Sequence, residues 1–275
     1  MKNRNREKYT FANINLLGKC NANCFFCLGK DIEEYLTAYN HLMVHFSEWE
    51  NFETFLSTCE EHGIKNLYLT GQTADGLQYN YLTDLITYLQ DERGFIVGLR
   101  SNGYLALHKM SDIQKMKGEI GYSIHTFNGE ANYKIMGRMD IPRWDQIIPQ
   151  SGDNVRISIV LNRHNAYRLE DILKALSVYE NVKYIQVRKV STDTRKELLN
   201  LDMYLFEEIK VKFSQLYKKV GEFNMAEIFN VYGKDVSFWS TVETSVNSLN
   251  YFTDGVCSDE YFIVEGYLKN KVVLK

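Results

Sequence analysis

Short apolar, β-branched runs alternate with longer segments of helical periodicity, and this alternation constrains the fold more than any other feature of the sequence. Six runs are predicted to be strands: Asn13–Leu17, Asn66–Thr70, Phe95–Arg100, Gly121–His125, Val155–Leu161 and Tyr184–Val190. Helical periodicity is found over Ser47–His62, Tyr81–Gln90, Ser111–Met116, Arg168–Tyr179 and Leu201–Val220. This order is typical of parallel strands joined by right-handed crossovers. We therefore expect an α/β fold, a partial (β/α)6 TIM-like barrel with a small C-terminal extension.

The clearest predicted helix is Ser47–His62. Ser47 with Glu50 at the capping-box spacing predicts its beginning, and Gly63 predicts its end. Cys59 falls on the apolar face of this helix, so we expect it to be a core residue.

The alternation is lost from Phe223 onward. The remaining sequence predicts one further strand, Met225–Val231, and a hairpin that turns at Glu265-Gly266. The strands of this hairpin are expected at Tyr261–Val264 and Leu268–Val273. We accordingly expect the barrel in residues 1–194, and in residues 195–275 a helix, a strand and a hairpin that close it.

Composition excludes several classes of protein. The 275 residues carry a net charge of −3, and the basic residues are scattered, which makes nucleic acid an unlikely partner. No apolar run approaches the ~18 residues of a membrane span, and the charged N-terminus lacks a secretory pattern. We expect a cytoplasmic protein without a membrane partner. In that reducing compartment, five cysteines do not indicate a disulfide framework.

Three cysteines lie within eight residues, in the loop that follows the first predicted strand. Cys20, Cys24 and Cys27 have the spacing C-x3-C-x2-C. A structural zinc site requires a fourth ligand, and His41 and His45 lie in an aromatic stretch that is more typical of packing. A [4Fe-4S] cluster held by three thiolates leaves one iron open for another ligand. From the residues alone, an iron-sulfur enzyme and a zinc-stabilised, non-catalytic binding protein both remain open.

The cysteine spacing, with Phe26 at an aromatic position before the last cysteine, resembles the radical S-adenosylmethionine superfamily. The resemblance covers roughly Tyr9 to Ser191 and is nearest to the molybdenum-cofactor cyclase-like, SPASM-twitch branch. It implies that the three cysteines ligate a [4Fe-4S] cluster and that S-adenosyl-L-methionine is the second cofactor. It further implies reductive cleavage of this cofactor to a 5′-deoxyadenosyl radical, which abstracts hydrogen from a substrate.

The resemblance also implies cofactor-binding residues at the strand ends. Leu69-Thr70-Gly71-Gln72-Thr73-Ala74 stands where the family has Gly-Gly-Glu-Pro, so the usual glutamate is replaced by Thr73, and Gln72 or Asp75 is the candidate substitute. Arg100-Ser101-Asn102-Gly103 resembles a Thr-Asn-Gly passage, and Tyr122-Ser123-Ile124-His125 a Ser-x-Asp/His passage. The cofactor-binding candidates are Phe26, Gly71, Gln72, Thr73, Ser101, Asn102, Ser123, Ser158, Arg163 and Val187.

Several of these residues have simpler interpretations. Gly71 and Gly103 are also typical turn glycines, and Ser123 and Ser158 are small residues that leave room inside a barrel. His125 is the candidate catalytic residue, although a histidine at a strand end is often structural. Arg163 and Arg188 are candidate ligands of a substrate anion or partners of carboxylates at the rim.

Cys257 opens a passage that resembles the cysteine-rich hairpin of some family members, but the other cysteines of an auxiliary cluster are missing. The motif does not specify the outcome on the substrate, which could be epimerisation, crosslinking, rearrangement or an oxidoreductase reaction. We expect a peptide or small-molecule substrate, and an electron donor such as flavodoxin or ferredoxin.

Overall fold

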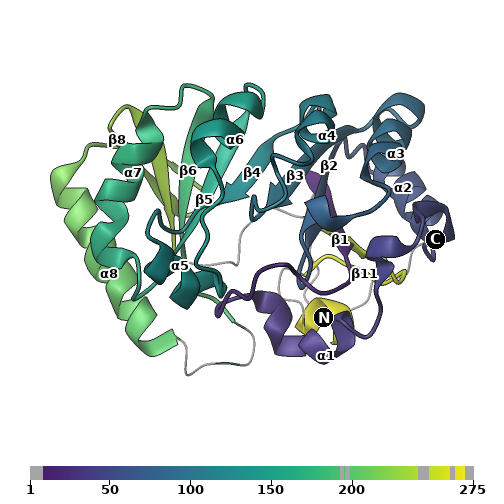
Figure 1. Ribbon diagram of the computed structural model, residues 1–275, viewed down its shortest axis with the longest axis horizontal. Helices are drawn as coiled ribbons and strands as arrows, with labels where there is room; N and C mark the ends of the chain where they lie inside the picture. Colours follow the sequence, from purple (N-terminus) through teal and green to yellow (C-terminus); the bar gives the residue numbers. More distant parts are fainter. Residues whose placement is uncertain (1–8, 193–194, 196–198, 241–247, 261–263, 270–275) are drawn as a thin grey trace.

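The computed structural model describes residues 9–192, 195, 199–240, 248–260 and 264–269. Its centre is a curved sheet with helices along its outer side (Figure 1). The six predicted strands are present, in chain order, as neighbours in the sheet, and each pairs in parallel with the next. They are β1 Phe11–Leu16, β2 Asn66–Gly71, β3 Ile96–Ser101, β4 Ile120–Ser123, β5 Val155–Leu161 and β6 Val182–Lys189. The predicted partial α/β barrel is confirmed.

Five more strands extend both edges of this sheet. They are β7 Lys219–Phe223, β8 Ala226–Val231, β9 Lys234–Trp239, β10 Ser248–Phe252 and β11 Cys257–Ser258. β9 pairs in parallel with β6, and β10 pairs in parallel with β1. Of the five, the sequence predicted β8 alone. The predicted boundary between the barrel, residues 1–194, and its C-terminal extension, residues 195–275, stays a prediction.

The predicted C-terminal hairpin is wrong where the structure describes it, because Val264–Lys269 (η8) is a single helical turn. The turn places Tyr267 against Phe252, with 5.1 Å between the ring centroids. The Tyr267 hydroxyl donates to Asp254 Oδ2 at 2.5 Å. These contacts favour a helical turn over an extended hairpin strand. The rest of the predicted hairpin, residues 261–263 and 270–273, lies outside the described residues.

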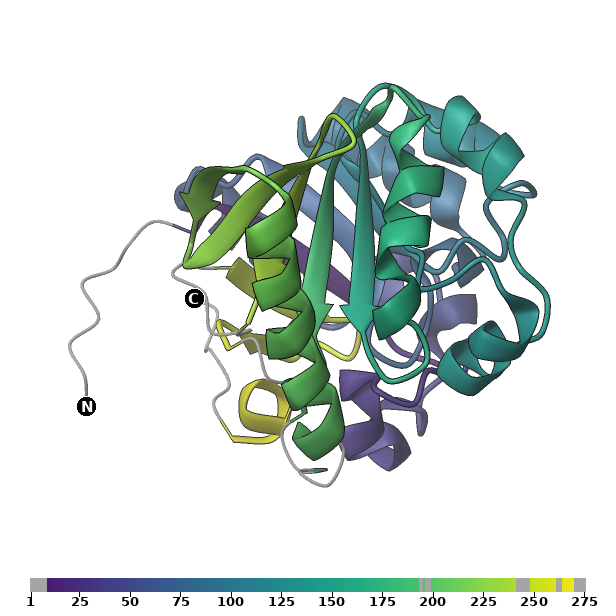
Figure 2. The same ribbon diagram turned by 90° about the vertical axis from the view of Figure 1, so that its left-hand side faces the viewer.

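The helices are α1 Glu33–Leu36, α2 Phe52–Glu61, α3 Leu82–Thr87, α4 Met110–Lys115, α5 Gly129–Met136, α6 Trp144–Gln150, α7 Leu169–Ser177 and α8 Leu199–Leu216. Shorter turns are η1 Leu28–Ile32, η2 His41–Met43, η3 Phe46–Glu48, η4 Gly76–Gln78, η5 Tyr88–Glu92 and η6 Ala166–Arg168. α8 packs against β5 and β6 and faces the viewer in Figure 2. Among the helices of the described residues, none has the length and apolar character that a membrane span requires.

The predicted cap at Ser47 is wrong. α2 begins at Phe52, because Asn51 has a left-handed backbone (φ 57°) that separates the helix from the turn containing Ser47. Gly63 follows the helix with φ 67°, as the predicted stop requires. Cys59 is fully buried in the hydrophobic core, as predicted, and Cys257 belongs to the same core.

The two faces of the sheet differ in character. Successive side chains of a strand point to opposite faces, and in β1 to β6 the apolar set packs with the helices in one large core. Ile14, Leu69, Leu99, Ile157 and Ile185 are fully buried members of that core. The alternate positions carry mainly polar or small residues, among them Asn15, Thr70, Arg100, Gly121, Ser123, Arg156, Ser158 and Gln186. This polar inner face forms the wall of the candidate site.

Candidate active site

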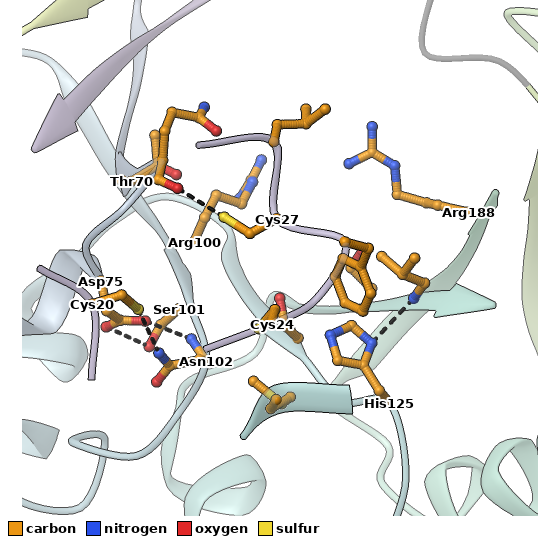
Figure 3. Close-up of a pocket in the computed structure, with 18 of the residues that line it drawn as sticks. Cys20, Cys24, Cys27, Thr70, Asp75, Arg100, Ser101, Asn102, His125 and Arg188 are labelled. Atoms are coloured by element: carbon orange, nitrogen blue, oxygen red, sulfur yellow. Dashed lines mark hydrogen bonds between the residues drawn. The ribbon is translucent and has the colours of Figure 1, made fainter. Parts of the chain in front are cut away.

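One pocket lies at the carboxyl ends of the parallel strands, where α/β barrels bind their ligands. The loop after β1 contributes the three motif cysteines, and the ends of β2 to β6 contribute polar side chains. Figure 3 shows the three thiols spread around this pocket, with Asp75, Ser101 and Asn102 on one side and His125 and Arg188 on the other. The lining residues are Cys20, Cys24, Phe26, Cys27, Leu28, Thr70, Gly71, Gln72, Ala74, Asp75, Arg100, Ser101, Asn102, Ser123, His125, Met136, Ser158, Val160, Arg188, Lys189 and Ser191.

The three thiols have few polar partners. Cys20 Sγ accepts from the Ala22 amide at 3.4 Å and from Asn102 Nδ2 at 3.6 Å. The Cys27 thiol donates to the Gln72 carbonyl at 2.8 Å. Burial raises the pKa of Cys20 to about 12, and it also raises the pKa of Cys24 and of Cys27. The chain alone therefore keeps these thiols protonated, and the positive charge of a bound metal would stabilise thiolates there.

The arrangement of the thiols can be tested against the two kinds of metal centre. Ligands of one zinc ion lie about 2.3 Å from it and hence within about 4 Å of one another. Within the part of the chain that the structure describes, no three His, Cys, Asp or Glu side chains converge closely enough to hold one metal ion. In a cubane, each cysteine binds a different iron. Three thiols that do not converge on one point are compatible with ligation of three different irons.

The cysteine loop is held against the end of β2 by a close backbone approach. A Cβ atom on Gly29 would lie 2.0 Å from the Gln72 carbonyl oxygen, so only glycine fits there without movement. The same carbonyl accepts the Cys27 thiol. Gly29 thus fixes the distance between the cysteine loop and the β2 end.

Two other segments hold the outer side of this loop. The amides of Asn23 and Phe25 donate to the carbonyls of Met136 and Ile135 at the end of α5, at 2.7 and 3.1 Å. Arg195 donates to the Phe25 carbonyl at 2.8 Å and to the Cys27 carbonyl at 2.6 Å. The loop is therefore positioned mainly through its backbone.

Asp75 connects the ends of β2 and β3 beside the cysteines. It is buried, and its carboxylate accepts from the Ser101 hydroxyl at 3.0 Å and from the amides of Leu77 and Asn102 at 3.0 and 2.6 Å. Burial raises the pKa of Asp75, while these donors act in the opposite direction. The carboxylate orients Asn102, which contacts Cys20.

His125 is a neutral imidazole at physiological pH. Burial lowers its pKa to about 3, and its Nδ1 accepts from the Val160 amide at 3.1 Å. The neutral ring therefore carries its proton on Nε2. The ring packs edge-on against Phe26, with 5.1 Å between the centroids. His125 can offer one N–H donor but is not positioned to act as a charged acid near pH 7.

Comparison with known proteins shows which solved structures have a similar fold. The chain matches no family model. Its structure resembles SuiB of Streptococcus suis bound to S-adenosylmethionine, with a TM-score of 0.64 and 13% identity over 96% of this chain and 63% of SuiB. It also resembles HemN of Escherichia coli, a coproporphyrinogen III oxidase described as a radical SAM enzyme, with a TM-score of 0.53 and 10% identity over 98% of this chain and 72% of HemN.

A sequence relative agrees with this fold. An S-adenosylmethionine-dependent nucleotide dehydratase of a Thermoplasmatales archaeon (strain ISO4-H5) is 30% identical over 133 residues, which are 48% of this chain and 43% of that protein. The chain is therefore similar in part of its sequence to an S-adenosylmethionine-dependent enzyme, and in its fold to SuiB and HemN. It spans less than half of this curated relative and under two thirds of SuiB.

The radical S-adenosylmethionine resemblance assigned cofactor-binding roles to ten residues, and the structure brings most of them to the pocket. Those that line it are Phe26, Gly71, Gln72, Ser101, Asn102, Ser123 and Ser158. Thr73, Arg163 and Val187 do not. Thr73 is buried beside Gly29, and Val187 belongs to the hydrophobic core. Arg163 forms an ion pair with Asp202 of α8 at 2.8 Å. The cofactor roles of all ten residues stay predictions.

The radical S-adenosylmethionine motif gave no reason to select several polar residues that the pocket contains. Thr70, Arg100 and Lys189 line it, and Arg156 lies on β5 two residues before Ser158. A sequence signal for two of them exists, because Arg100 and Arg156 are each two residues from a predicted site residue. Side chains two residues apart on a strand share a face.

Proposed function

We propose that this chain is a radical S-adenosylmethionine enzyme that holds a [4Fe-4S] cluster with Cys20, Cys24 and Cys27. The observation that carries the proposal is the position of the three thiols, on one loop around a polar pocket at the strand ends. When bound, the cluster and S-adenosyl-L-methionine supply a 5′-deoxyadenosyl radical that abstracts hydrogen from a substrate, with electrons from a donor such as flavodoxin or ferredoxin.

In this proposal the protein's own residues bind the cofactors, orient the substrate and exclude water from the pocket. Asn102, held by Asp75, donates toward Cys20 and fixes one corner of the site. Across the pocket from Asn102, the apolar ring of Phe26 packs against the neutral ring of His125. These two rings form a wall that limits the access of water. A primary-carbon radical attacks most nearby C–H bonds, so exclusion of water and exact placement determine the product.

The substrate is proposed as a peptide or a small molecule. SuiB has been crystallised with its precursor peptide SuiA, and the archaeal relative is a nucleotide dehydratase, so the similar proteins include both classes. Either class would react in the pocket, near Phe26, His125 and Arg188.

The experiment is anaerobic reconstitution, followed by incubation with dithionite and S-adenosyl-L-methionine and detection of 5′-deoxyadenosine by mass spectrometry. The wild type should release this product, and Cys24→Ala should abolish release. Cys257→Ala, which removes a buried cysteine outside the loop, is the matched control and should retain it. A zinc-loaded, colourless wild type without 5′-deoxyadenosine would support the zinc-stabilised binding protein instead.

A further inference from the structure

Two arginines meet on the inner face of the sheet, below the pocket residues Ser123 and Ser158. Arg100 of β3 and Arg156 of β5 both lie in register with Gly121 of β4, which separates them. A Cβ atom at Gly121 would lie 2.8 Å from Arg156 Nη2 and 3.2 Å from Arg100 Nη1. The two guanidinium groups therefore converge in the space that the absent side chain leaves.

A single carboxylate serves both cations. Glu119 lies 3.0 Å from Arg100 Nη1 and 3.4 Å from Arg156 Nε, and it also accepts from the Tyr184 hydroxyl at 2.6 Å. Asp75, the carboxylate that lines the same pocket, is already bonded to Ser101 and to two backbone amides. The floor of the pocket thus carries two positive charges against one negative charge.

Arg156 has hydrogen-bonding capacity that the chain does not use. Its residue is 9% exposed, and Nη1 donates to Gln186 at 2.7 Å. Nε lies 3.4 Å from Glu119 in an ion pair but makes no hydrogen bond. An unsatisfied buried donor costs about 1–3 kcal/mol, more when charged. Burial and the charge of Arg100 lower the pKa of Arg156 to about 10, so it stays protonated near pH 7. An excess buried cation with an open donor favours an anionic ligand.

The pocket reaches Arg100, which lines the cavity together with Ser123 and Ser158, two residues further toward the strand ends. Arg156 is not a lining residue; its guanidinium lies beside that of Arg100 at Gly121, behind Ser158. Serine side chains are small, so a ligand that contacts Arg100 would lie near Arg156 as well. Two guanidinium groups suit the oxygens of a phosphate or carboxylate, with which arginine forms paired, charge-assisted hydrogen bonds.

We propose that Arg100 and Arg156 bind the oxyanion of a small-molecule substrate, a phosphate or carboxylate group, at the floor of the pocket. This inference rests on the proposed function and adds the substrate class. It places the reacting carbon between this floor and the cysteine loop. A small anionic metabolite is therefore the substrate class, rather than a neutral peptide segment.

The test uses the reconstituted enzyme with saturating S-adenosyl-L-methionine and titrates it with pyrophosphate and with citrate by calorimetry. The wild type should bind at least one probe, and the preferred probe tells phosphate from carboxylate. Arg156→Gln should weaken binding about tenfold or more, the effect of losing a charge-assisted contact. Gly121→Ala, which keeps both charges but displaces the guanidinium groups, should also weaken it. Arg143→Gln, at an exposed arginine paired with Asp145, is the matched control and should bind as the wild type does.

Three results would overturn the inference: no binding of either probe by the wild type, equal binding by the wild type and Gly121→Ala, or probe binding that is seen only in a parallel titration without S-adenosyl-L-methionine. The last would assign the pair to the cofactor. If Arg156→Gln does not fold, Gly121→Ala decides. 5′-Deoxyadenosine release without the probe, measured on the same preparation, separates the two proposals. Release without probe binding removes this inference alone, and probe binding without release removes the proposed function alone.

Discussion

The cysteine loop and the arginine floor lie at two levels of one pocket, and they are built differently. The loop is positioned by backbone contacts, from Gly29 against Gln72 and from the amides of Asn23 and Phe25 against α5. The floor is positioned by side-chain charges, with Glu119 between Arg100 and Arg156. A loop fixed mainly through its backbone leaves its three thiols with few polar partners. The charged side chains of the floor can replace a contact with each other by a contact with a ligand.

The difference predicts that the loop is most sensitive to added volume at its close backbone approach, and that the stability of the floor is most sensitive to the loss of a charge. The largest effect is expected at Gly29. Gly29→Ala places a Cβ atom 2.0 Å from the Gln72 carbonyl, so the loop must move away from β2. We expect near-complete loss of bound iron after reconstitution, measured by iron and sulfide analysis. Gly221→Ala, where the nearest atom is 3.8 Å away, is the control. Full iron content in Gly29→Ala would show that the close approach is not needed.

The next effect concerns the charge of the floor. Glu119→Gln removes the carboxylate that two arginines share and leaves buried cations without their partner. The free energy of unfolding should fall by about 3 kcal/mol, as when a buried ion pair loses one member. Urea unfolding measures this, with the exposed Glu222→Gln as the control. A change below about 0.5 kcal/mol, typical of surface sites, would contradict the account.

A smaller effect is expected at Arg195, which connects the loop with the segment after β6. Arg195→Gln removes the charged donor to the Phe25 and Cys27 carbonyls and the partner of Asp31. Unfolding should become easier by about 2 kcal/mol, and bound iron should be lost faster to a chelator. Arg168→Gln, at an exposed arginine, provides the comparison. Equal rates of iron loss in the two variants would show that Arg195 does not position the loop.

The smallest effect is the pH dependence from His125, on the wall between loop and floor. Its pKa is about 3 in the folded protein and about 6.5 when unfolded, so the unfolded state binds more protons between these values. Stability is therefore full above pH 6.5 and falls with acidification. His125 should contribute a loss of about 1.4 kcal/mol between about pH 7.5 and about pH 5.5. Urea unfolding of His125→Gln should show a correspondingly smaller loss of stability between these two pH values. The same loss as in the wild type would refute the lowered pKa of His125.

The sequence predicted the parts of the molecule whose signal is local. The six parallel strands follow from apolar, β-branched runs, and the cysteine loop follows from the spacing of three residues. The helices α1, α5 and α6 were not predicted, and α6 contains Pro149, a residue that argues against a helix interior. The Ser47 cap failed because Asn51 takes a left-handed backbone, which its type allows but does not require.

The pocket contains the contiguous cysteine motif and also Ser123 and Ser158, but it does not contain every residue that was assigned on or after a strand. Val187 and Arg188 are neighbours on β6, so they point to opposite faces, and the pocket contains Arg188. Arg163 follows the end of β5, and its partner Asp202 lies on a helix far along the chain. No local pattern indicates such a pairing. Arg100 and Arg156, by contrast, could have been selected from the strand period alone.

The most direct test of the central claim is whether the three thiols hold a cluster with one iron open to S-adenosyl-L-methionine. The measurement is the iron content of the anaerobically reconstituted wild type, with the electron paramagnetic resonance spectrum of its reduced form before and after addition of S-adenosyl-L-methionine. The account predicts about four irons per chain and a spectrum that changes when the cofactor is added. A protein that retains zinc in place of iron, or a cluster whose spectrum the cofactor leaves unchanged, would contradict it.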